Sequence, residues 1–260
     1  MHYFEFPTKD TTLYEDSGSQ NTSLDEILEV RKDMNDDGSV VEVSRILIKF
    51  DLTYISESIE SGLIPSNANY YLNLYDANST GLHVSQNLYA YPVSRSWNEG
   101  SGKRDSRPVI EDGCSWKWKD GDTGRTQWNE VSQSGGTWYS GSDGQYSLEA
   151  SQSFTNEAAD LRMDVTGIVN NWIYSGSSYA NEGFMVKRSG SVGNTDSGSG
   201  VTEGDSTQYG QLKFFSRDTS TIYPPKLEVV WDDHSWSTGS LAPLTGSALE
   251  DTVIYFKGLR

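Results

Sequence analysis

The chain has 260 residues, enough for one large domain, and its 8 Trp, 15 Tyr and 8 Phe supply large side chains for a core. Twenty Lys and Arg against 37 Asp and Glu give a formal net charge of −17, which repels nucleic-acid phosphates and anionic lipid surfaces. The composition therefore disfavours a disordered chain, a nucleic-acid-binding protein and a protein of membrane surfaces.

Cysteine and histidine usage argues against a disulfide-stabilised protein and against a zinc enzyme. Cys114 is the only cysteine, so no intrachain disulfide can form, and His2, His83 and His234 lie far apart without zinc-ligand spacing.

The first residues lack a basic segment followed by an apolar run, and no stretch of about 18 apolar residues occurs. We expect neither an export signal nor a membrane span.

The first half of the chain alternates between apolar and polar residues with a period of two, which is typical of strands that place one face on a core. Clusters of Gly, Ser, Asn and Asp separate the apolar runs and indicate turns. The predicted strands are residues 46–50, 70–75, 88–93, 183–187, 211–215 and 226–231. Many short strands with punctuating turns predict a sandwich or barrel.

One segment has a helical period instead. Val165, Ile168, Val169, Trp172 and Ile173 recur on one face, behind Asp164 as an acceptable N-cap. We predict a short amphipathic helix over residues 165–174 that packs against an open end of the sandwich.

Two segments lack the residues to build a core of their own. Residues 188–210 are dominated by Gly, Ser and Thr, and loops of this length are often functional. Beyond Trp231 the composition changes again, and a strand-like run, Val253–Phe256, has no obvious partner within its own segment. We therefore predict a β-sandwich domain over residues 1–231 and a C-terminal extension over 232–260 that acts as a docking element.

A series of fragments in a fixed order resembles the disaggregatase-related (DNRLRE-type) β-sandwich domains, which occur in cell-surface proteins and in phage virion proteins. The resembling fragments are residues 6–14, Asn21, 44–52, 97–102, Ser115 and Trp116, Trp128, Gly135 and Gly136, 164–166, Trp172, 181–184, Phe215 and Ser216, and 225–229. The resemblance implies an all-β, antiparallel, jelly-roll-like sandwich with one short helix and the C-terminal extension.

Two fragments of this series have a physical interpretation. Arg45, beside an alternating strand, can pair with a carboxylate at the sheet edge, and Asn181-Glu182-Gly183 supplies a turn before a strand.

A calcium site is one interpretation of Asp33, Asn35 and Asp37, whose D-x-N-x-D-G spacing places alternate oxygens around a hard cation. Ser44 stands where the bidentate Glu of a calcium loop would be, and both flanks are strand-like. The interpretation that we favour is a hairpin tip with Asp-Gly turn chemistry, so that no cofactor is expected and calcium is at most a surface ion.

Tryptophans offer a second candidate site. Trp116, Trp118 and Trp138 could stack on sugar rings, and Trp116 and Trp118 would point to the same side of a strand. The alternative is that the aromatic residues of this loop-rich region fill a small core of their own, with their indole N–H groups bonded locally.

Catalytic signals are weak by comparison. Glu99 and Asp112, near the tryptophans, are the first suspects for a glycosidase-like acid and base pair, but a surplus of carboxylates is usually a solvated surface. Acidic residues around Cys114 would raise its pKa, so a packing role is favoured over an activated thiolate. No nucleophile elbow, zinc-protease or P-loop motif is present.

The leading hypothesis is a non-catalytic structural protein of a bacteriophage virion, in the tail, neck or head decoration. The resemblance and the expected lack of an export signal both favour a protein that is made in the cytoplasm and assembled into particles. Its expected partners are other virion proteins and copies of itself, with a host glycan possible and neither nucleic acid nor membrane expected. The alternatives are a carbohydrate-binding or receptor-binding module and, less favoured, a polysaccharide-active enzyme.

Overall fold

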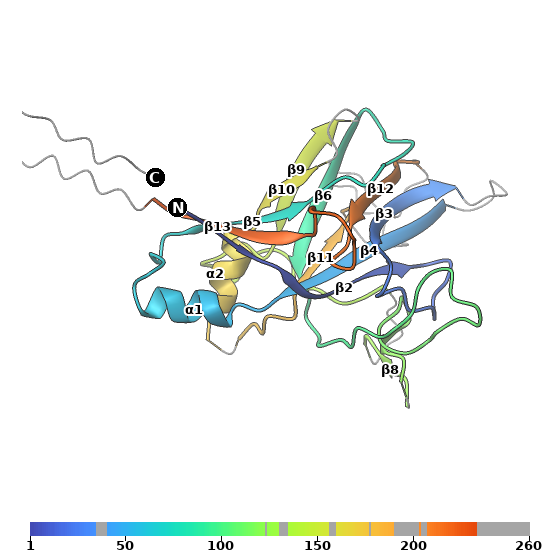
Figure 1. Ribbon diagram of the computed structural model, residues 1–260, viewed down its shortest axis with the longest axis horizontal. Coiled ribbons are helices and arrows are strands. Elements are labelled where there is room, and N and C mark those ends of the chain that lie inside the picture. The colour runs from blue at the N-terminus through green and yellow to red at the C-terminus, as the bar shows by residue number, and fades with distance from the viewer. Residues whose placement is uncertain are drawn as a thin grey trace, which may run out of the picture.

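The computed structural model describes residues 1–34, 41–122, 124–129, 135–155, 160–176, 178–189, 203 and 207–232, and the side chains of Val41 and Phe154 are not among the described parts. The described chain is an all-β, antiparallel, sandwich-like fold, as predicted (Figure 1). No helix in these ranges is both long and apolar enough to cross a membrane.

Four strands form the smaller sheet, in the order β1-β13-β5-β10. They are β1 (His2–Glu5), β13 (Lys226–Val230), β5 (Asn69–Leu74) and β10 (Leu161–Asp164). All three pairings in this sheet are antiparallel.

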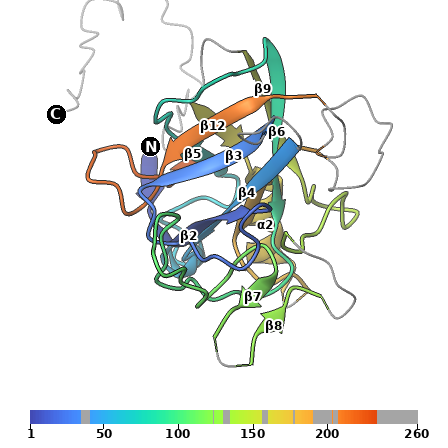
Figure 2. The same cartoon turned by 90° about the vertical axis from the view of Figure 1, so that its right-hand side faces the viewer.

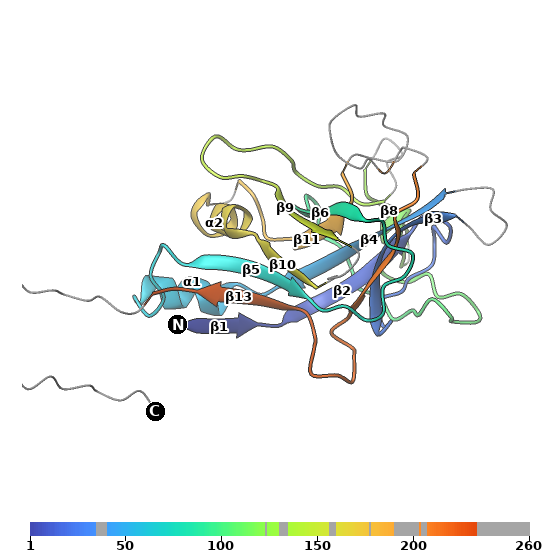
Figure 3. The same ribbon diagram turned by 90° about the horizontal axis from the view of Figure 1, so that it is seen from above.

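Seven strands form the larger sheet, in the order β12-β3-β4-β11-β6-β9, with β2 also paired to β4. They are β2 (Pro7–Tyr14), β3 (Ile27–Met34), β4 (Val41–Phe50), β6 (Ser85–Pro92), β9 (Ala150–Thr155), β11 (Phe184–Lys187) and β12 (Gly210–Phe215). One side of the long strand β4 is shared, because β3 pairs with its first residues and β2 with the rest. A separate hairpin, β7 (Trp118–Asp120) with β8 (Thr126–Gln127), lies at the opposite end of the molecule from α1 (Figures 1 and 3).

All six predicted strands are confirmed, each within a few residues of its predicted bounds. The predicted helix is confirmed as α2 (Thr166–Tyr174), and Ile168 and Val169 on it are buried in the sandwich core. The prediction of a single helix is wrong, because α1 (Thr53–Glu60) follows β4 directly and buries Ile55 in the same core.

Both helices start in the same way. Asp51-Leu52-Thr53 and Asp164-Val165-Thr166 each place an Asp two residues before the first helical Thr, whose backbone N–H donates to the Asp Oδ1 at 3.0 Å. The bond satisfies one of the N–H groups that a helix start leaves without an intrahelical partner. The predicted N-cap Asp164 thus makes the expected bond, but from the position before the N-cap, which is Val165.

Two cores cover the two faces of β4. Ile46, Ile48 and Phe50 point into the main core between the two sheets. Val43 and Leu47 point to the opposite face, where a second core lies under the described parts of residues 93–138. The second core consists of Leu13, Val43, Leu47, Val93, Trp97, Cys114, Trp116, Trp128 and Met185. The middle of the larger sheet, around β4 and β11, is therefore covered on both faces, and Figure 2 shows β7 and β8 beside the sheet.

The division at residue 231 stays a prediction, since of the extension only Asp232 lies within the described residues. Trp231 still belongs to the body, because its backbone N–H donates to the Met1 carbonyl and its ring packs against the main core.

Candidate functional site

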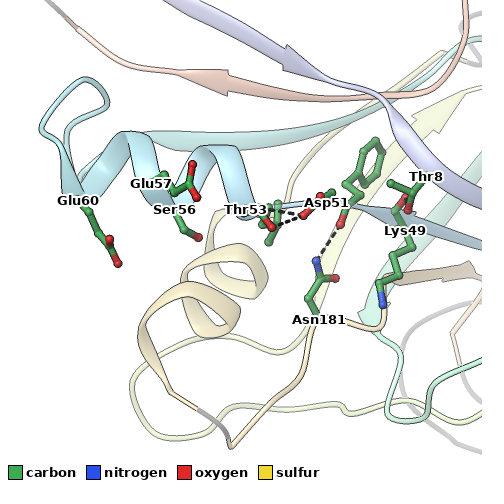
Figure 4. Close-up of a pocket in the computed structure, with 10 residues that line it drawn as sticks. Thr8, Lys49, Asp51, Thr53, Ser56, Glu57, Glu60 and Asn181 are labelled. Carbon is green, nitrogen blue, oxygen red and sulfur yellow. Dashed lines mark hydrogen bonds between the residues drawn. The ribbon is translucent and has the colours of Figure 1, made fainter.

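An open depression of about 620 Å³ lies where β4 ends and α1 begins. Figure 4 shows the side chains around it. The lining residues are Thr8, Lys49, Phe50, Asp51, Leu52, Thr53, Ser56, Glu57, Glu60 and Asn181.

Hydrogen bonds fix the shape of this depression. The Asp51 carboxylate accepts from the backbone N–H and the hydroxyl of Thr53, at 3.0 and 2.6 Å. The Asn181 amide donates to the Phe50 carbonyl at 2.9 Å, and the N–H of Gly183 donates to the Asn181 side chain at 3.1 Å. The predicted turn at 181–183 is thereby confirmed, and it holds the start of β11 against the end of β4.

Acidic groups dominate the charge of the depression. Asp51, Glu57 and Glu60 line it, whereas the ammonium group of Lys49 pairs with Glu182 at 2.9 Å. The bonds from Thr53 lower the pKa of Asp51, so this carboxyl is ionised at neutral pH and accepts hydrogen bonds rather than donating a proton. The Asp51 carboxylate therefore suits hydroxyl or amino groups of a ligand.

Of the predicted sugar-stacking residues, Trp116 and Trp138 are brought together around one guanidinium group. The Arg45 guanidinium carbon lies 4.6 Å from the Trp116 ring centroid and 5.1 Å from that of Trp138, and the Lys187 ammonium lies 4.7 Å from the Trp138 ring. Trp116 is buried and Trp138 is half-buried. These contacts are cation–π interactions within the protein: Arg45 covers one face of the Trp116 ring, and the residue as a whole is buried.

Trp118 differs from the other two. It is half-buried at the start of β7, and the guanidinium group of Arg125 lies 5.9 Å from its ring. Glycan stacking stays a prediction, and Trp118 is the residue best placed for it. The alternative, a small aromatic core, describes Trp97 and Trp128: both are buried, and their indole N–H groups donate to the carbonyls of Glu182 and Ser115.

The suspected acid and base residues have separate partners. Glu99 accepts from the Asp10 backbone N–H at 3.2 Å and pairs with Arg217 at 3.2 Å. Asp112 accepts from the backbone N–H and the hydroxyl of Ser101, at 3.0 and 2.6 Å. Both carboxylates hold loops together in this arrangement.

A carboxyl that the sequence did not single out, Asp10, lies beside Glu99. Asp10 is fully buried on β2, and its Oδ2 accepts from the Arg217 backbone N–H at 2.8 Å. Its Oδ1 has no hydrogen-bond partner within the described ranges. Burial raises the pKa of Asp10 to about 7, against the lowering effect of Arg217.

A second group of buried charges forms a network around Arg45. Its guanidinium group makes two bonds to Glu203, Nε to Oε1 at 3.1 Å and Nη2 to Oε2 at 2.7 Å. It also donates to the Gly135 carbonyl, and Lys187 lies 3.4 Å from the same Glu203 carboxylate. All three charged side chains are almost fully buried, and burial lowers the pKa of Lys187 to about 8.

The expectation that Arg45 pairs with a carboxylate is confirmed, but the pair is buried rather than at a sheet edge. Its partner comes from the long segment between β11 and β12, 158 residues further along the chain. Residues 190–202 and 204–206 of that segment lie outside the described residues.

Of the three predicted calcium ligands, only Asp33 lies within the described residues. Asp33 lies near the end of β3, and its Oδ1 accepts from the Met34 backbone N–H at 2.9 Å. Asn35 and Asp37 lie outside the described residues. The pairing of Met34 with Val41 confirms a hairpin at this point, while calcium stays a prediction.

Cys114 is buried in the second core, as the packing interpretation predicted. Its pKa is raised, but chiefly by burial rather than by acidic neighbours.

Sequence reasoning did not find one surface feature, a run of exposed apolar side chains over the smaller sheet. Phe4, Phe6, Ile222 and Tyr223 expose 43, 52, 80 and 48% of their surface. Tyr223 contacts the rings of Tyr75 and Phe215, at centroid distances of 5.4 and 6.4 Å. The Lys226 ammonium lies 5.0 Å from the rings of both Phe4 and Tyr75, so it connects Phe4 on β1 with the aromatic group around Tyr223. We call Phe4, Phe6, Tyr75, Phe215, Ile222, Tyr223 and Lys226 the apolar strip.

The alternation of Phe4 and Phe6 with Tyr3 and Glu5 could have indicated this strip, but only if β1 had been recognised as a strand at a sheet edge. Neither a protein-family model nor a curated protein matches this chain, so the resemblance to DNRLRE-type domains stays a prediction.

Proposed function

We propose that this chain is a non-catalytic structural component of a bacteriophage virion, in the tail, neck or head decoration. Other virion proteins and further copies of the chain are its partners in this proposal. The apolar strip is the observation that carries it, together with the resemblance of the sequence to domains found in virion proteins.

The apolar strip has the chemistry of a protein-docking surface. Large contiguous apolar patches are uncommon on monomeric soluble proteins, and aromatic residues are enriched where proteins meet. The strip lies over β1, β13 and the segment between β12 and β13. A protein with a net charge of −17 repels its own copies at long range, so a short-range apolar contact is a suitable means of holding neighbours together.

The body behind the strip suits a rigid building unit. Both faces of the larger sheet are covered around β4 and β11, and buried ion pairs join β4, β11 and Glu203. Such a body keeps its shape when it is packed between neighbours, because well-packed interiors have low compressibility.

A carbohydrate-binding or receptor-binding module is the second candidate. The half-buried Trp118 and the hydrogen-bonding depression at α1 favour it, since stacking and hydroxyl recognition are the two contacts that sugars need. The polysaccharide-active enzyme has less support, because Glu99 and Asp112 each have a local partner.

Substitution of the strip tests the leading proposal. We expect Ile222→Ser combined with Tyr223→Ser to reduce incorporation of the chain into particles by about tenfold or more, since the loss of a buried aromatic contact commonly costs over 1 kcal/mol. Leu63→Ser is the matched control, since Leu63 is 69% exposed and follows α1. Incorporation is measured by quantitative mass spectrometry of purified particles. Equal incorporation of the wild-type chain, the 222/223 variant and the Leu63→Ser control would contradict docking through the strip.

A further inference from the structure

Among the described residues, the smaller sheet has an open edge at β1. β1 is the last strand of the order β1-β13-β5-β10, and Figure 3 shows it outside β13. Met1 and Trp231 exchange backbone hydrogen bonds, at 2.6 and 3.2 Å. In an antiparallel pair the bonded residues alternate, so Tyr3 and Glu5 direct their backbone groups to β13, and His2 and Phe4 direct theirs away from the sheet.

Within the described part of the chain, this edge lacks the usual protection against pairing. Natural edge strands are commonly protected by Lys, Pro, a bulge or a covering segment. His2–Glu5 contains neither Lys nor Pro, and its register with β13 is regular from residue 2 to residue 5. Phe4 and Phe6 beside it are half exposed. An edge of this kind is a template for one more strand.

The chain contains a suitable strand in its C-terminal extension. Residues 233–260 follow the described part, and Asp232 comes directly after Trp231, which pairs with Met1. The extension therefore starts beside Met1, at the N-terminal end of β1. Its run Thr252-Val253-Ile254-Tyr255-Phe256 is made entirely of β-branched and aromatic residues, which have high strand propensity.

The connection is long enough and favours contact within one chain. Residues 233–251 can span roughly 60 Å when extended, several times the length of β1. A connection of this length between two binding elements gives an effective concentration in the millimolar range, which a second copy would match only at millimolar protein.

We propose that Thr252–Phe256 adds as a strand to the open edge of β1 in the same chain. The added strand bonds to the backbone groups of His2 and Phe4 and places its side chains beside Phe4 and Phe6. The expected docking element thus docks on its own body, and this contact does not depend on the proposed function.

Amide hydrogen exchange of the full chain, measured by NMR, tests the contact residue by residue. The Phe4 amide faces the open edge, and the Tyr3 amide is bonded to β13 in either case. We expect Ile254→Pro combined with Tyr255→Pro to speed exchange at Phe4 by at least about tenfold and to leave Tyr3 unchanged. Ser240→Pro combined with Leu241→Pro is the matched control and should change neither amide. Equal exchange at Phe4 in the wild-type chain and the 254/255 variant would overturn the proposal.

Dilution separates the same chain from a second copy. Protection of Phe4 that is constant from millimolar to low micromolar protein supports pairing within one chain. Protection that is lost on dilution would overturn the proposal and assign the strand to a neighbouring copy. Neither result depends on particles, so the failure of this inference is distinct from the failure of the proposed function.

Discussion

The two cores on either side of β4 are built from different chemistry. Toward the smaller sheet, Ile46, Ile48 and Phe50 belong to an apolar core that is contributed mainly by strands and helices. Toward residues 93–138, Val43 and Leu47 meet tryptophans and a thiol held by loops, and Arg45 lies between them in a buried ion network.

The difference shows what irregular segments need in order to fill a core. A strand buries its backbone polar groups in the ladder, whereas a loop must satisfy them one at a time. Side chains do this here, because Asn21 donates to the carbonyls of Glu99 and Cys114, and Trp128 donates to Ser115. The main core is formed by apolar residues that alternate with polar ones along its strands. The second core also needs side chains that donate hydrogen bonds to the carbonyls of its loops.

Truncation of one residue in each core tests whether the loop-built core stabilises the fold as much as the main core. We expect Trp128→Ala to lower the free energy of unfolding by about 3–5 kcal/mol and Leu72→Ala by about 2–5 kcal/mol, since both side chains are fully buried. Denaturant unfolding at constant slope measures both losses. A loss below about 1 kcal/mol for Trp128→Ala alone would show that the second core is loosely packed.

Loss of the shared carboxylate tests the ion network. Glu203→Gln should cost about 3 kcal/mol, because it leaves the buried Arg45 and Lys187 cations without their counter-charge. Glu57→Gln, at an exposed position on α1, is the control and should change stability by less than about 0.5 kcal/mol. Equal small losses would contradict the burial of the network.

The buried carboxyl of Asp10 should make stability fall as pH rises. Its folded pKa of about 7 lies above the ordinary value of 3.8, so the folded state binds the proton more tightly than the unfolded state does. The contribution is complete below about pH 4 and is lost as pH rises toward 7, and it amounts to at least about 1 kcal/mol.

Asp10→Asn removes this titration. The variant should gain stability relative to the wild type at pH 8 and show a flatter profile between pH 4 and 7. Paired thermal-unfolding profiles across this range measure the difference. Parallel profiles for the two chains would mean that Asp10 is solvated.

Apart from the control at Glu57, the smallest effect on stability is expected at Trp118. Trp118→Ala should change the free energy of unfolding by no more than about 1 kcal/mol, because its ring is only half-buried. If the chain binds glycans, the same substitution should abolish that binding, which a glycan array measures. A large loss of stability would place Trp118 in the second core with Trp128.

The sequence predicted what depends on local periodicity. Strands such as residues 46–50 and 211–215 and the helix at 165–174 all have a period that one segment suffices to display. The helix α1 was missed because eight residues with two isoleucines show little periodicity, although the Asp51-Leu52-Thr53 start repeats that of α2.

Contacts between distant segments could not be read in the same way. Nothing near Glu203 indicates that it pairs with Arg45, and nothing near Asp10 indicates that its carboxyl is buried against Arg217. The apolar strip likewise joins residues 4–6 to residues 222–226, and neither segment has an apolar patch of its own. Such sites exist only once the topology has brought their parts together.

Density-gradient sedimentation of native material from the producing cells tests the central claim most directly. Mass spectrometry of the fractions follows this chain beside known particle proteins. The proposed function predicts that the chain co-migrates with intact particles at a fixed stoichiometry. Recovery only as a small free species would contradict a virion component and would direct attention to glycan binding at Trp118.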